Sequence, residues 1–487
     1  MKKAAAKKIT SLLLLLFMLL SAVACASPDV PAETGTETEA VTDDGRIHAD
    51  LPPTDFEGYT FSMLHWNIPG WTIHGIDLYT EELNSDPIND AVYRRNALIS
   101  EKYNVVFSYD EEPATDVFDR IRSSISANED LYDLVYLRLC DMPSLMLEGD
   151  FLDIEHDVGY VDLDKPYWDQ AVRKEMTFAG RLYLVIGSLN ITDKNSTACV
   201  VFNKRLAADY GIPDPYQSVR SGSWTLDALT SCMDAVDGDL DGDGKINPEN
   251  DIVSFLGVHD VAASFFTGGG GRYTVKDEYD YPIPCFNTEE TYDLISAILD
   301  IMERPDFTNS HMVTYPKDLS VYFAENKGLF CWVRSGDVIG MRGEEGVDFG
   351  VLPTPKYDDL QEEYLSAISR HTAGFTSILS VETQPDTVGF ILEALTAESH
   401  YGLQEAYYDV TLKTKSARDD ESQDMLDLIF AHRVVDIAEI CDFGAFPSQI
   451  LYMATGTGRR MASLYSSYEK SLTAAMEDFL DKIDALD

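Results

Sequence analysis

The sequence predicts an α/β protein large enough for two lobes. Of its 487 residues, about 435 follow a polar N-terminal segment, enough for two separate hydrophobic cores. Strand-like segments alternate with helix-like segments up to about residue 137, and a second α/β region begins near residue 204. This alternation favours parallel sheets with helices on their faces.

The first α/β region is expected to contain three strands separated by helices. Strand-like aromatic and apolar residues fill 59–66, 105–109 and 132–137. The helix after the first strand is expected to begin with Asp86 as its N-cap and Pro87 at its first position. Ligands of such sheets bind at the carboxyl ends of the strands. Candidate binding residues are therefore expected at these strand ends.

The second region combines helices, strands and a helical C-terminal part. Thr225 is a plausible N-cap, and 288–304 carries an apolar stripe of helical period. The segments 347–359 and 371–380 are strand-like. The last helix is expected to bury one face formed by Leu472, Met476, Phe479, Ile483 and Leu486.

The N-terminus has the pattern of a secretory signal. Four lysines precede an apolar run of about fourteen residues, which is short for a membrane span, so residues 1–24 are interpreted as a signal peptide. The run ends in "AVAC", which resembles a bacterial lipobox with Cys25 as the lipidated residue. An ordinary signal peptide with a chance cysteine is the alternative. Residues 25–52 are then expected to form a disordered acidic tether.

The strong negative charge makes nucleic acid an improbable partner. Removal of the signal takes away four lysines, so 33 basic residues remain against 84 acidic ones, a net −51. Such a surface repels polyanions. Apart from Cys25, the cysteines stand at least 33 positions apart and form no CxxC motif. Because several stand in apolar surroundings, we expect buried free thiols, with one or two disulfides left open as an alternative.

An acidic loop at 237–251, "DGDLDGDGKINPEND", predicts a calcium site. Calcium loops of the EF-hand type place oxygen ligands at positions 1, 3, 5, 7 and 12 and glycine at position 6. Counted from Asp239, the loop offers Asp239, Asp241 and Asp243, and then the carbonyl of Lys245. Position 12 is an asparagine, so Asp251, one place later, is the expected last ligand.

Glu249 is the alternative last ligand of this loop, and an acidic turn without an ion is the alternative interpretation of the whole segment. Because extracellular calcium is plentiful, we expect the ion to stabilise the fold and to take no part in ligand binding.

Several stretches together resemble a known family. They are "DFEGYTFSML", "INDAVYRRNALISEKYNVVF", "PYWDQAVRKEMTFAGRLYLVIG", "VVFNKRLAADYGIPDPY", "SWTLDAL", the acidic loop, "VDFGVLPTPKYDDLQEEY" and "LKTKSARDDESQDMLDLIF". In this order they resemble the carbohydrate-binding, family 1 type of extracellular solute-binding lipoproteins of bacterial ABC importers.

The resemblance implies a two-lobed, periplasmic-binding-protein-like (Venus flytrap) fold with a multi-segment hinge. The expected first lobe comprises 53–200 plus about 349–400, and the second comprises 201–348 plus about 401–487. A sugar or oligosaccharide would bind in the cleft between the lobes and pass to a permease. The protein would act as a monomer, lipid-anchored on the extracellular face of the cytoplasmic membrane.

Candidate sugar-binding residues are aromatic and planar polar side chains at strand ends, because rings stack on sugars and polar groups grip hydroxyls. Trp71 lies near the end of the first strand as well. Each candidate has a structural alternative, as a core residue or as an ion-pair partner. The candidates are His65, Trp66, Asn67, Arg138, Asp141, Asn195, His259, Asp260, Trp332, Arg334 and His371.

Two other functions were weighed against solute binding. A secreted carbohydrate-active hydrolase needs two positioned carboxylates, and 84 acidic residues make any chosen pair uninformative. The sequence contains neither GxSxG nor HExxH, and no catalytic residues are assigned. A cell-surface adhesion protein of the dockerin kind would need two calcium loops, and the sequence has one.

Overall fold

The structure is a computed structural model that describes residues 46–67, 77–310, 316–341, 347–413, 420–452 and 461–486. The chain divides into two units, Met1–Arg46 and Ile47–Asp487. The second unit contains a four-stranded sheet and a five-stranded sheet. The signal peptide, Cys25, most of the tether and Trp71 lie outside the described residues.

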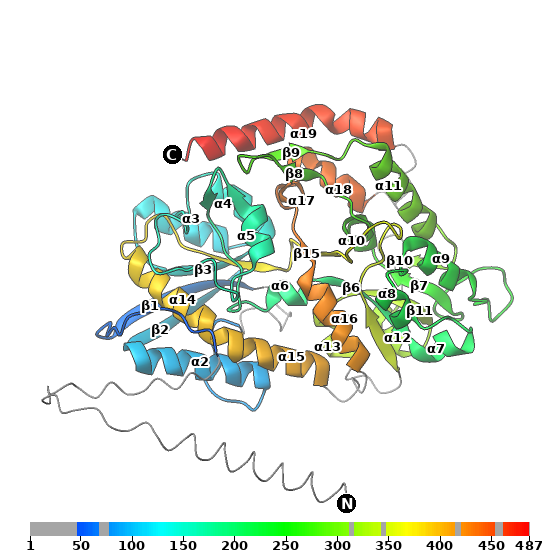
Figure 1. Cartoon of the computed structure of the whole chain (residues 1–487), viewed down its shortest axis with the longest axis horizontal. Helices are drawn as coiled ribbons and strands as arrows, with labels where there is room; N and C mark the ends of the chain where they lie inside the picture. Colours follow the sequence, from blue (N-terminus) through cyan, green and yellow to red (C-terminus); the bar gives the residue numbers. More distant parts are fainter. Residues whose placement is uncertain are drawn as a thin grey trace, which may run out of the picture. The chain divides into compact units, whose positions relative to one another are not determined.

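The first lobe is built on a four-stranded sheet with the order β14-β3-β1-β2 (Figure 1). Its strands are β1 (Tyr59–Asn67), β2 (Val105–Pro113), β3 (Leu134–Arg138) and β14 (Gly374–Ser377). β1 runs parallel to β2 and β3, which confirms the parallel arrangement expected from the sequence, and β14 is antiparallel to β3.

Helices connect the parallel strands of this sheet. They are α2 (Pro87–Tyr103) and α3 (Val117–Ala127). Asp86 caps α2 as predicted, because its carboxylate accepts a hydrogen bond from the Asn89 backbone N–H at 3.0 Å. Smaller elements follow β3, namely η1 (Leu139–Asp141), α4 (Met142–Met146), α5 (Gln170–Met176), β4 (Thr177–Phe178) and β5 (Arg181–Leu182).

The second lobe is built on a five-stranded sheet with the order β10-β7-β11-β6-β12. Its strands are β6 (Ala198–Asn203), β7 (Val253–Gly257), β10 (Phe307–Asn309), β11 (Gly328–Arg334) and β12 (Phe349–Leu352). β7 is parallel to β10 and β11, whereas β6 is antiparallel to β11 and β12.

The pairing of β12 corrects the expected lobe boundary. Residues 349–352 were assigned to the first lobe, but Gly350 pairs with Phe202 inside the second sheet, and all four residues of β12 are buried there. The chain returns to the first sheet only at β14. The boundary at 349 is therefore wrong for β12.

Further helices and a hairpin surround the second sheet. The hydroxyl of Thr225 accepts from the Ala228 N–H at 3.2 Å, so Thr225 is the N-cap predicted. The elements are α7 (Lys204–Asp209), α8 (Pro215–Arg220), α9 (Leu226–Asp234), α10 (Asp260–Gly268), β8 (Thr274–Lys276), β9 (Pro282–Pro284), α11 (Glu289–Met302), α12 (Leu319–Ala324) and α13 (Ser335–Met341).

The C-terminal helices return to both lobes, which corrects the assignment of 401–487 to the second lobe alone. α15 packs against α2 of the first lobe, whereas α16 packs against β12 of the second. In α19, Tyr465 stacks on Phe286 of the second lobe and Phe479 packs edge-on against Phe178 of the first. The helices are α14 (Pro385–Tyr401), α15 (Leu403–Lys413), α16 (Asp420–Ala431), α17 (Ile437–Cys441), η2 (Phe443–Ala445), α18 (Phe446–Leu451) and α19 (Met461–Asp484).

The predicted apolar face of α19 faces the protein interior. Leu472, Met476, Phe479 and Ile483 are buried, and Leu486 is half-buried. Figure 1 shows α19 in red near α18, and α19 contacts both α18 and η2.

Several segments run between the lobes and form a hinge. α6 (Thr192–Asn195) leads from the first lobe into β6. On the way back, β13 (Ser366–Ala367) pairs in parallel with β15 (Arg433–Val434). The two lobes are therefore joined by more than one strand of the chain, as the fold class requires.

The cysteines from Cys140 to Cys441 are free in the structure, as expected, but only Cys199 and Cys331 among them are fully buried. Within the described part of the chain, no helix combines the length and the apolar character that a bilayer crossing demands.

Candidate functional site

An arginine at the carboxyl end of β3 is held by an aspartate three residues later. The guanidinium of Arg138 donates to both carboxylate oxygens of Asp141, with Nε to Oδ2 at 2.9 Å and Nη2 to Oδ1 at 2.8 Å. The Arg138 side chain is 21% exposed and the Asp141 side chain 4%. This two-point contact fixes the guanidinium plane and leaves some of its donors for a ligand.

The second lobe repeats this arrangement at the end of β11. Arg334 donates to both oxygens of Asp337, each at 3.1 Å, and both side chains are partly exposed. The sequence signals are "RLCD" and "RSGD", each an arginine ending a strand followed by an aspartate three residues later. We predicted Arg334 from its strand end but did not predict Asp337.

His371 lies where charges from both lobes meet. Its pKa is lowered, first by partial desolvation and then by Arg370 and Arg138, whereas Asp260 and Asp141 act in the opposite direction. His371 is nevertheless exposed to solvent. The charges of Arg138, Asp141 and Asp260, three residues chosen from the sequence, therefore act on His371, the fourth.

Arg370, which the sequence analysis did not name, anchors this region to α17. Its guanidinium donates to the Glu439 carbonyl, to the Ile440 carbonyl at 3.4 Å and to Ser448 Oγ at 3.3 Å. A cation at the C-terminal end of a helix is favourable because the last carbonyls lack partners within the helix.

The Glu439 side chain adds an acid to the same region. Burial raises the pKa of Glu439 to about 7; Arg370 opposes the rise, and Asp436 and Asp260 add to it. We call the six side chains concerned the interlobe polar group. It consists of Arg138, Asp141, Asp260, Arg370, His371 and Glu439.

An aromatic pair lies beside the interlobe polar group. The ring of His259 stacks on Tyr452, with ring centres 5.6 Å apart and an interplanar angle of 10°. His259 Nδ1 is 3.2 Å from Asp260 Oδ2, and Tyr452 is half exposed. His259 was predicted; Tyr452, which follows a short helix, gave no periodic signal in the sequence.

Asn195 is placed next to the end of β11. A side-chain carbon added at Gly336 would stand 3.0 Å from the Asn195 Cβ, so the two residues are in contact. Asn195 is 7% exposed, and its Oδ1 has no hydrogen-bond partner among the described residues. The structure thus joins Asn195 to the Arg334 strand end.

His65 and Trp66 are core residues, which corrects their prediction as ligand contacts. Both are fully buried because β1 is an inner strand of its sheet and is covered on both faces. The Arg138 guanidinium lies 5.6 Å from the Trp66 ring, so Trp66 supports Arg138 from behind. Asn67 donates to the carboxylate of Glu111 at the strand end.

Trp332 is partly buried against α10. Its indole N–H donates to Ser264 Oγ at 3.0 Å, and the ring packs against the main hydrophobic core. This places Trp332 on the α10 side of the second sheet.

The acidic loop folds around its own aspartates. Oxygens of Asp239, Asp241 and Asp243 lie within 4.8 Å of one another. Asp239 accepts from the backbone N–H groups of Gly242 and Gly244, as a tight ligand loop requires. Lys245 follows directly, with its N–H bonded to Asp243.

Asp251 does not join these three carboxylates. It is 1% exposed, and its two oxygens accept from the N–H groups of Leu240 and Asn247, at 3.0 and 2.9 Å. Its position in the structure corrects its prediction as the last metal ligand. Asp251 instead closes the loop from the inside.

The fold is similar to those of several solved structures. M. tuberculosis UspC superposes with a TM-score of 0.57 at 14% identity, over 86% of this chain and 100% of that one. The sugar-binding protein MalE from Xanthomonas citri gives 0.57 at 12%, over 87% and 98%. The cyclic alpha-maltosyl-1,6-maltose binding protein from Arthrobacter globiformis gives 0.56 at 15%, over 86% and 100%.

No protein-family model matches the sequence, and a search of curated proteins gives no match either. The likeness to solved structures therefore concerns the fold. That fold is the two-lobed α/β architecture that the sequence analysis expected.

Proposed function

We propose that this protein binds a sugar or oligosaccharide between its two lobes and delivers it to the permease of an ABC importer. The observation that carries the proposal is the interlobe polar group, to which both lobes contribute on a sugar-binding protein fold. Carboxylates accept hydrogen bonds from sugar hydroxyls, and guanidinium groups donate to them. The half-exposed Tyr452 ring beside them offers an apolar face.

Similar structures support the choice of ligand class. Lmo0181 from Listeria monocytogenes was solved with cycloalternan, and a solute-binding protein from Thermotoga lettingae with alpha-D-tagatose. Ligands of this kind differ widely in size, so we propose the class and not the individual sugar. The proposed role is capture and delivery by a monomer, without a chemical step.

A thermal-shift screen against mono- and oligosaccharides tests this function. A ligand that binds only the native state stabilises it by about 2.7 kcal/mol at 100 times its Kd. We expect at least one sugar of the panel to raise Tm with dose, and isothermal titration to give a stoichiometry of one sugar per chain. If amino acids, peptides or polyamines raise Tm and no sugar does, the proposed ligand class is wrong.

We also propose that the protein is a lipoprotein held by Cys25 on the extracellular face of the cytoplasmic membrane. The lipobox-like "AVAC" and the polar segment after it support this placement. Membrane fractionation of the Cys25→Ala variant tests the anchor, and the variant is expected to leave the membrane fraction. If the variant stays with the membrane like the wild type, Cys25 does not hold the protein there.

The acidic loop is proposed to hold a structural Ca²⁺ ion through Asp239, Asp241, Asp243 and the Lys245 carbonyl. Three clustered carboxylates repel one another unless a cation offsets them. Chelation with EGTA is expected to lower Tm, and added Ca²⁺ to restore it, with sugar affinity unchanged within about twofold. The Asp241→Asn variant serves as the control and should respond less to EGTA. A loss of sugar affinity at unchanged Tm would place the ion at the ligand site instead.

A further inference from the structure

The β8–β9 hairpin of the second lobe exposes two apolar side chains and buries part of a lysine. Val275 and Ile283 pair across the hairpin, and each is 45% exposed. Lys276 follows Val275 and therefore lies on the opposite face of the strand, where it is half-buried. This orientation reverses the usual one, in which apolar side chains are inside and lysines outside. The contacts of Lys276 explain the reversal.

Lys276 binds the hairpin to the C-terminal end of α5 in the first lobe. Its ammonium group donates to the Lys174 carbonyl at 2.6 Å and to the Thr177 carbonyl, and it lies 4.8 Å from the centre of the Phe178 ring. The last carbonyls of a helix lack partners within the helix, so a cation is favourable there. Burial lowers the pKa of Lys276 to about 8, so most of these groups still carry their charge at pH 7.

The base of the hairpin is anchored in the second lobe. The ring of Tyr273, which precedes β8, packs against Phe266 and stacks on Phe286, with ring centres 4.9 and 5.7 Å away. The N–H groups of Tyr273 and Thr274 donate to the carboxylate of Asp436, at 2.7 and 3.1 Å. The hairpin therefore has a fixed base in one lobe, and its lysine reaches the other lobe.

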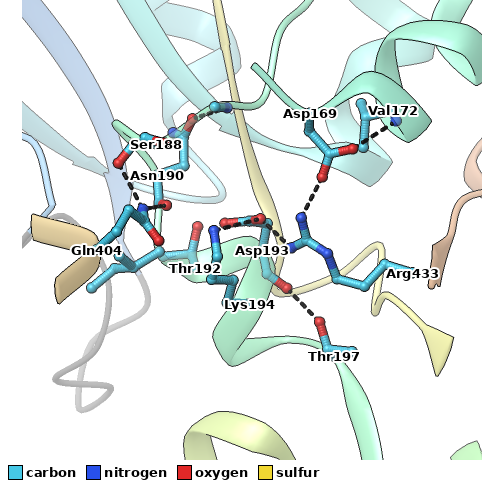
Figure 2. Close-up of polar contacts among 12 residues, drawn as sticks. Asp169, Val172, Ser188, Asn190, Thr192, Asp193, Lys194, Thr197, Gln404 and Arg433 are labelled. Atoms are coloured by element: carbon cyan, nitrogen blue, oxygen red, sulfur yellow. Dashed lines mark hydrogen bonds and ion pairs between the residues drawn. The ribbon is translucent and has the colours of Figure 1, made fainter. Parts of the chain in front are cut away.

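The opposite end of α5 is held from the hinge (Figure 2). Arg433 of the hinge strand β15 donates to Asp169, the N-cap of α5, and Asp169 accepts from the Val172 N–H at 3.0 Å. α5 has seven residues, so its two ends lie about 10 Å apart at 1.5 Å per residue. Because Arg433 belongs to the hinge, a rotation of the lobes about the hinge moves the Lys276 end of α5 further than the Asp169 end.

We propose that the β8–β9 hairpin is a strap between the lobes, which limits how far they separate through the contact of Lys276 with α5. Lobes that rotate apart break this contact, so its free energy adds to the free energy needed for opening. A binding protein loses affinity in proportion to the fraction of molecules that are not in the binding-competent state. A strap that disfavours wide opening therefore supports binding without touching the ligand.

Small-angle X-ray scattering of the mature chain without ligand tests the strap. Lys276→Met removes the ammonium group and keeps the length of the side chain. We expect its radius of gyration to exceed that of the wild type by about 1 Å, out of about 22 Å for a compact chain of this length. Lys276→Arg keeps donors for the two carbonyls and should scatter like the wild type. An unchanged radius of gyration in Lys276→Met would overturn the proposal.

The matched control is Lys356→Met, because Lys356 makes the same kinds of contact within the second lobe alone. Its ammonium group donates to the Gln361 carbonyl at 2.7 Å and lies 5.1 Å from the centre of the Tyr364 ring. We expect this variant to scatter like the wild type. Equal expansion of both variants would show a general loosening of the fold and would also overturn the proposal.

Two points of design keep the test decisive. If circular dichroism shows that Lys276→Met does not fold, Lys276→Gln is measured in its place, with an expansion expected again because the charge is lost. Since no ligand is added, the result does not depend on the sugar that the proposed function requires. The strap and the proposed ligand class can therefore fail separately.

Discussion

The Arg433→Met variant is expected to lose about 3–5 kcal/mol of unfolding free energy, because two carboxylates near the hinge lose their common partner. The side chains of Arg433, Asp169 and Asp193 are 8%, 12% and 0% exposed. Burial alone would lower the pKa of Arg433, but Asp193 and Asp169 outweigh it and raise that pKa. Removing one member of such a buried group leaves uncompensated charge, which costs far more than an exposed ion pair is worth.

An exposed arginine with two carboxylate partners provides the matched control. Arg220 contacts Glu421 at 2.8 Å and Asp424 at 3.3 Å, with side chains 34–62% exposed. Arg220→Met should cost far less stability than Arg433→Met, since such exposed pairs are screened by water. Urea unfolding of both variants measures the difference. Equal small losses in the two would show that the hinge group does not stabilise the fold.

A second substitution checks the reason for this loss. Adding Asp193→Asn to Arg433→Met removes one of the two unpaired charges, so the double variant should recover part of the stability. If the double variant is less stable by the sum of both single losses, the two residues act independently and buried charge is not the cause.

Local features of the fold could be predicted from the sequence. The N-caps Asp86 and Thr225 act on N–H groups three residues away, and the strand at 59–66 is recognisable from its own composition. Such signals lie within a few residues of one another. The parallel order of the first three strands follows from the helices between them.

Features that depend on distant residues could not be predicted in this way. β12 was placed in the wrong lobe because its partner strand β6 lies far away in the sequence. His65 and Trp66 were chosen because they end a strand, but their burial follows from the position of β1 inside the sheet. Arg433 stands 240 residues from Asp193 and 264 from Asp169, so no local pattern links the three.

Only part of the candidate site could be predicted, because some of its residues meet through contacts between segments that are distant in the sequence. Arg138 and Asp141 were chosen because they follow a strand, Asp260 because it precedes a helix, and His371 because it opens a strand-like segment. In the structure the charges of the first three act on His371. Arg370 and Glu439 were not found, because their contact joins a hinge segment to a short C-terminal helix. The Arg-x-x-Asp spacing at two strand ends was visible in the sequence and could have indicated Asp337.

The Arg138→Met variant is expected to bind the sugar from the screen about 10- to 150-fold more weakly than the wild type. Hydrogen bonds from a charged donor are worth about 1.5–3 kcal/mol, and the proposed function assigns such bonds to this guanidinium. Asp141 already holds two of its nitrogens, and Trp66 lies behind it, so little side-chain freedom is lost when a ligand binds. Isothermal titration of both proteins measures the change.

Stability must be separated from affinity in this variant, because Asp141 is almost fully buried and loses its partner. Arg304→Met is the matched control. Arg304 donates to both oxygens of Asp306, at 2.9 and 3.0 Å, and the two side chains are 22% and 14% exposed. Arg304 precedes β10, so it lies at the amino end of that strand, whereas Arg138 lies at the carboxyl end of β3. Arg304 also contacts Asp234 at 2.7 Å, so Arg304→Met should lose at least as much stability as Arg138→Met, whereas only Arg138→Met should lose affinity. Equal affinities of the two would move the sugar away from the end of β3, because a guanidinium that touches the ligand cannot be removed without loss.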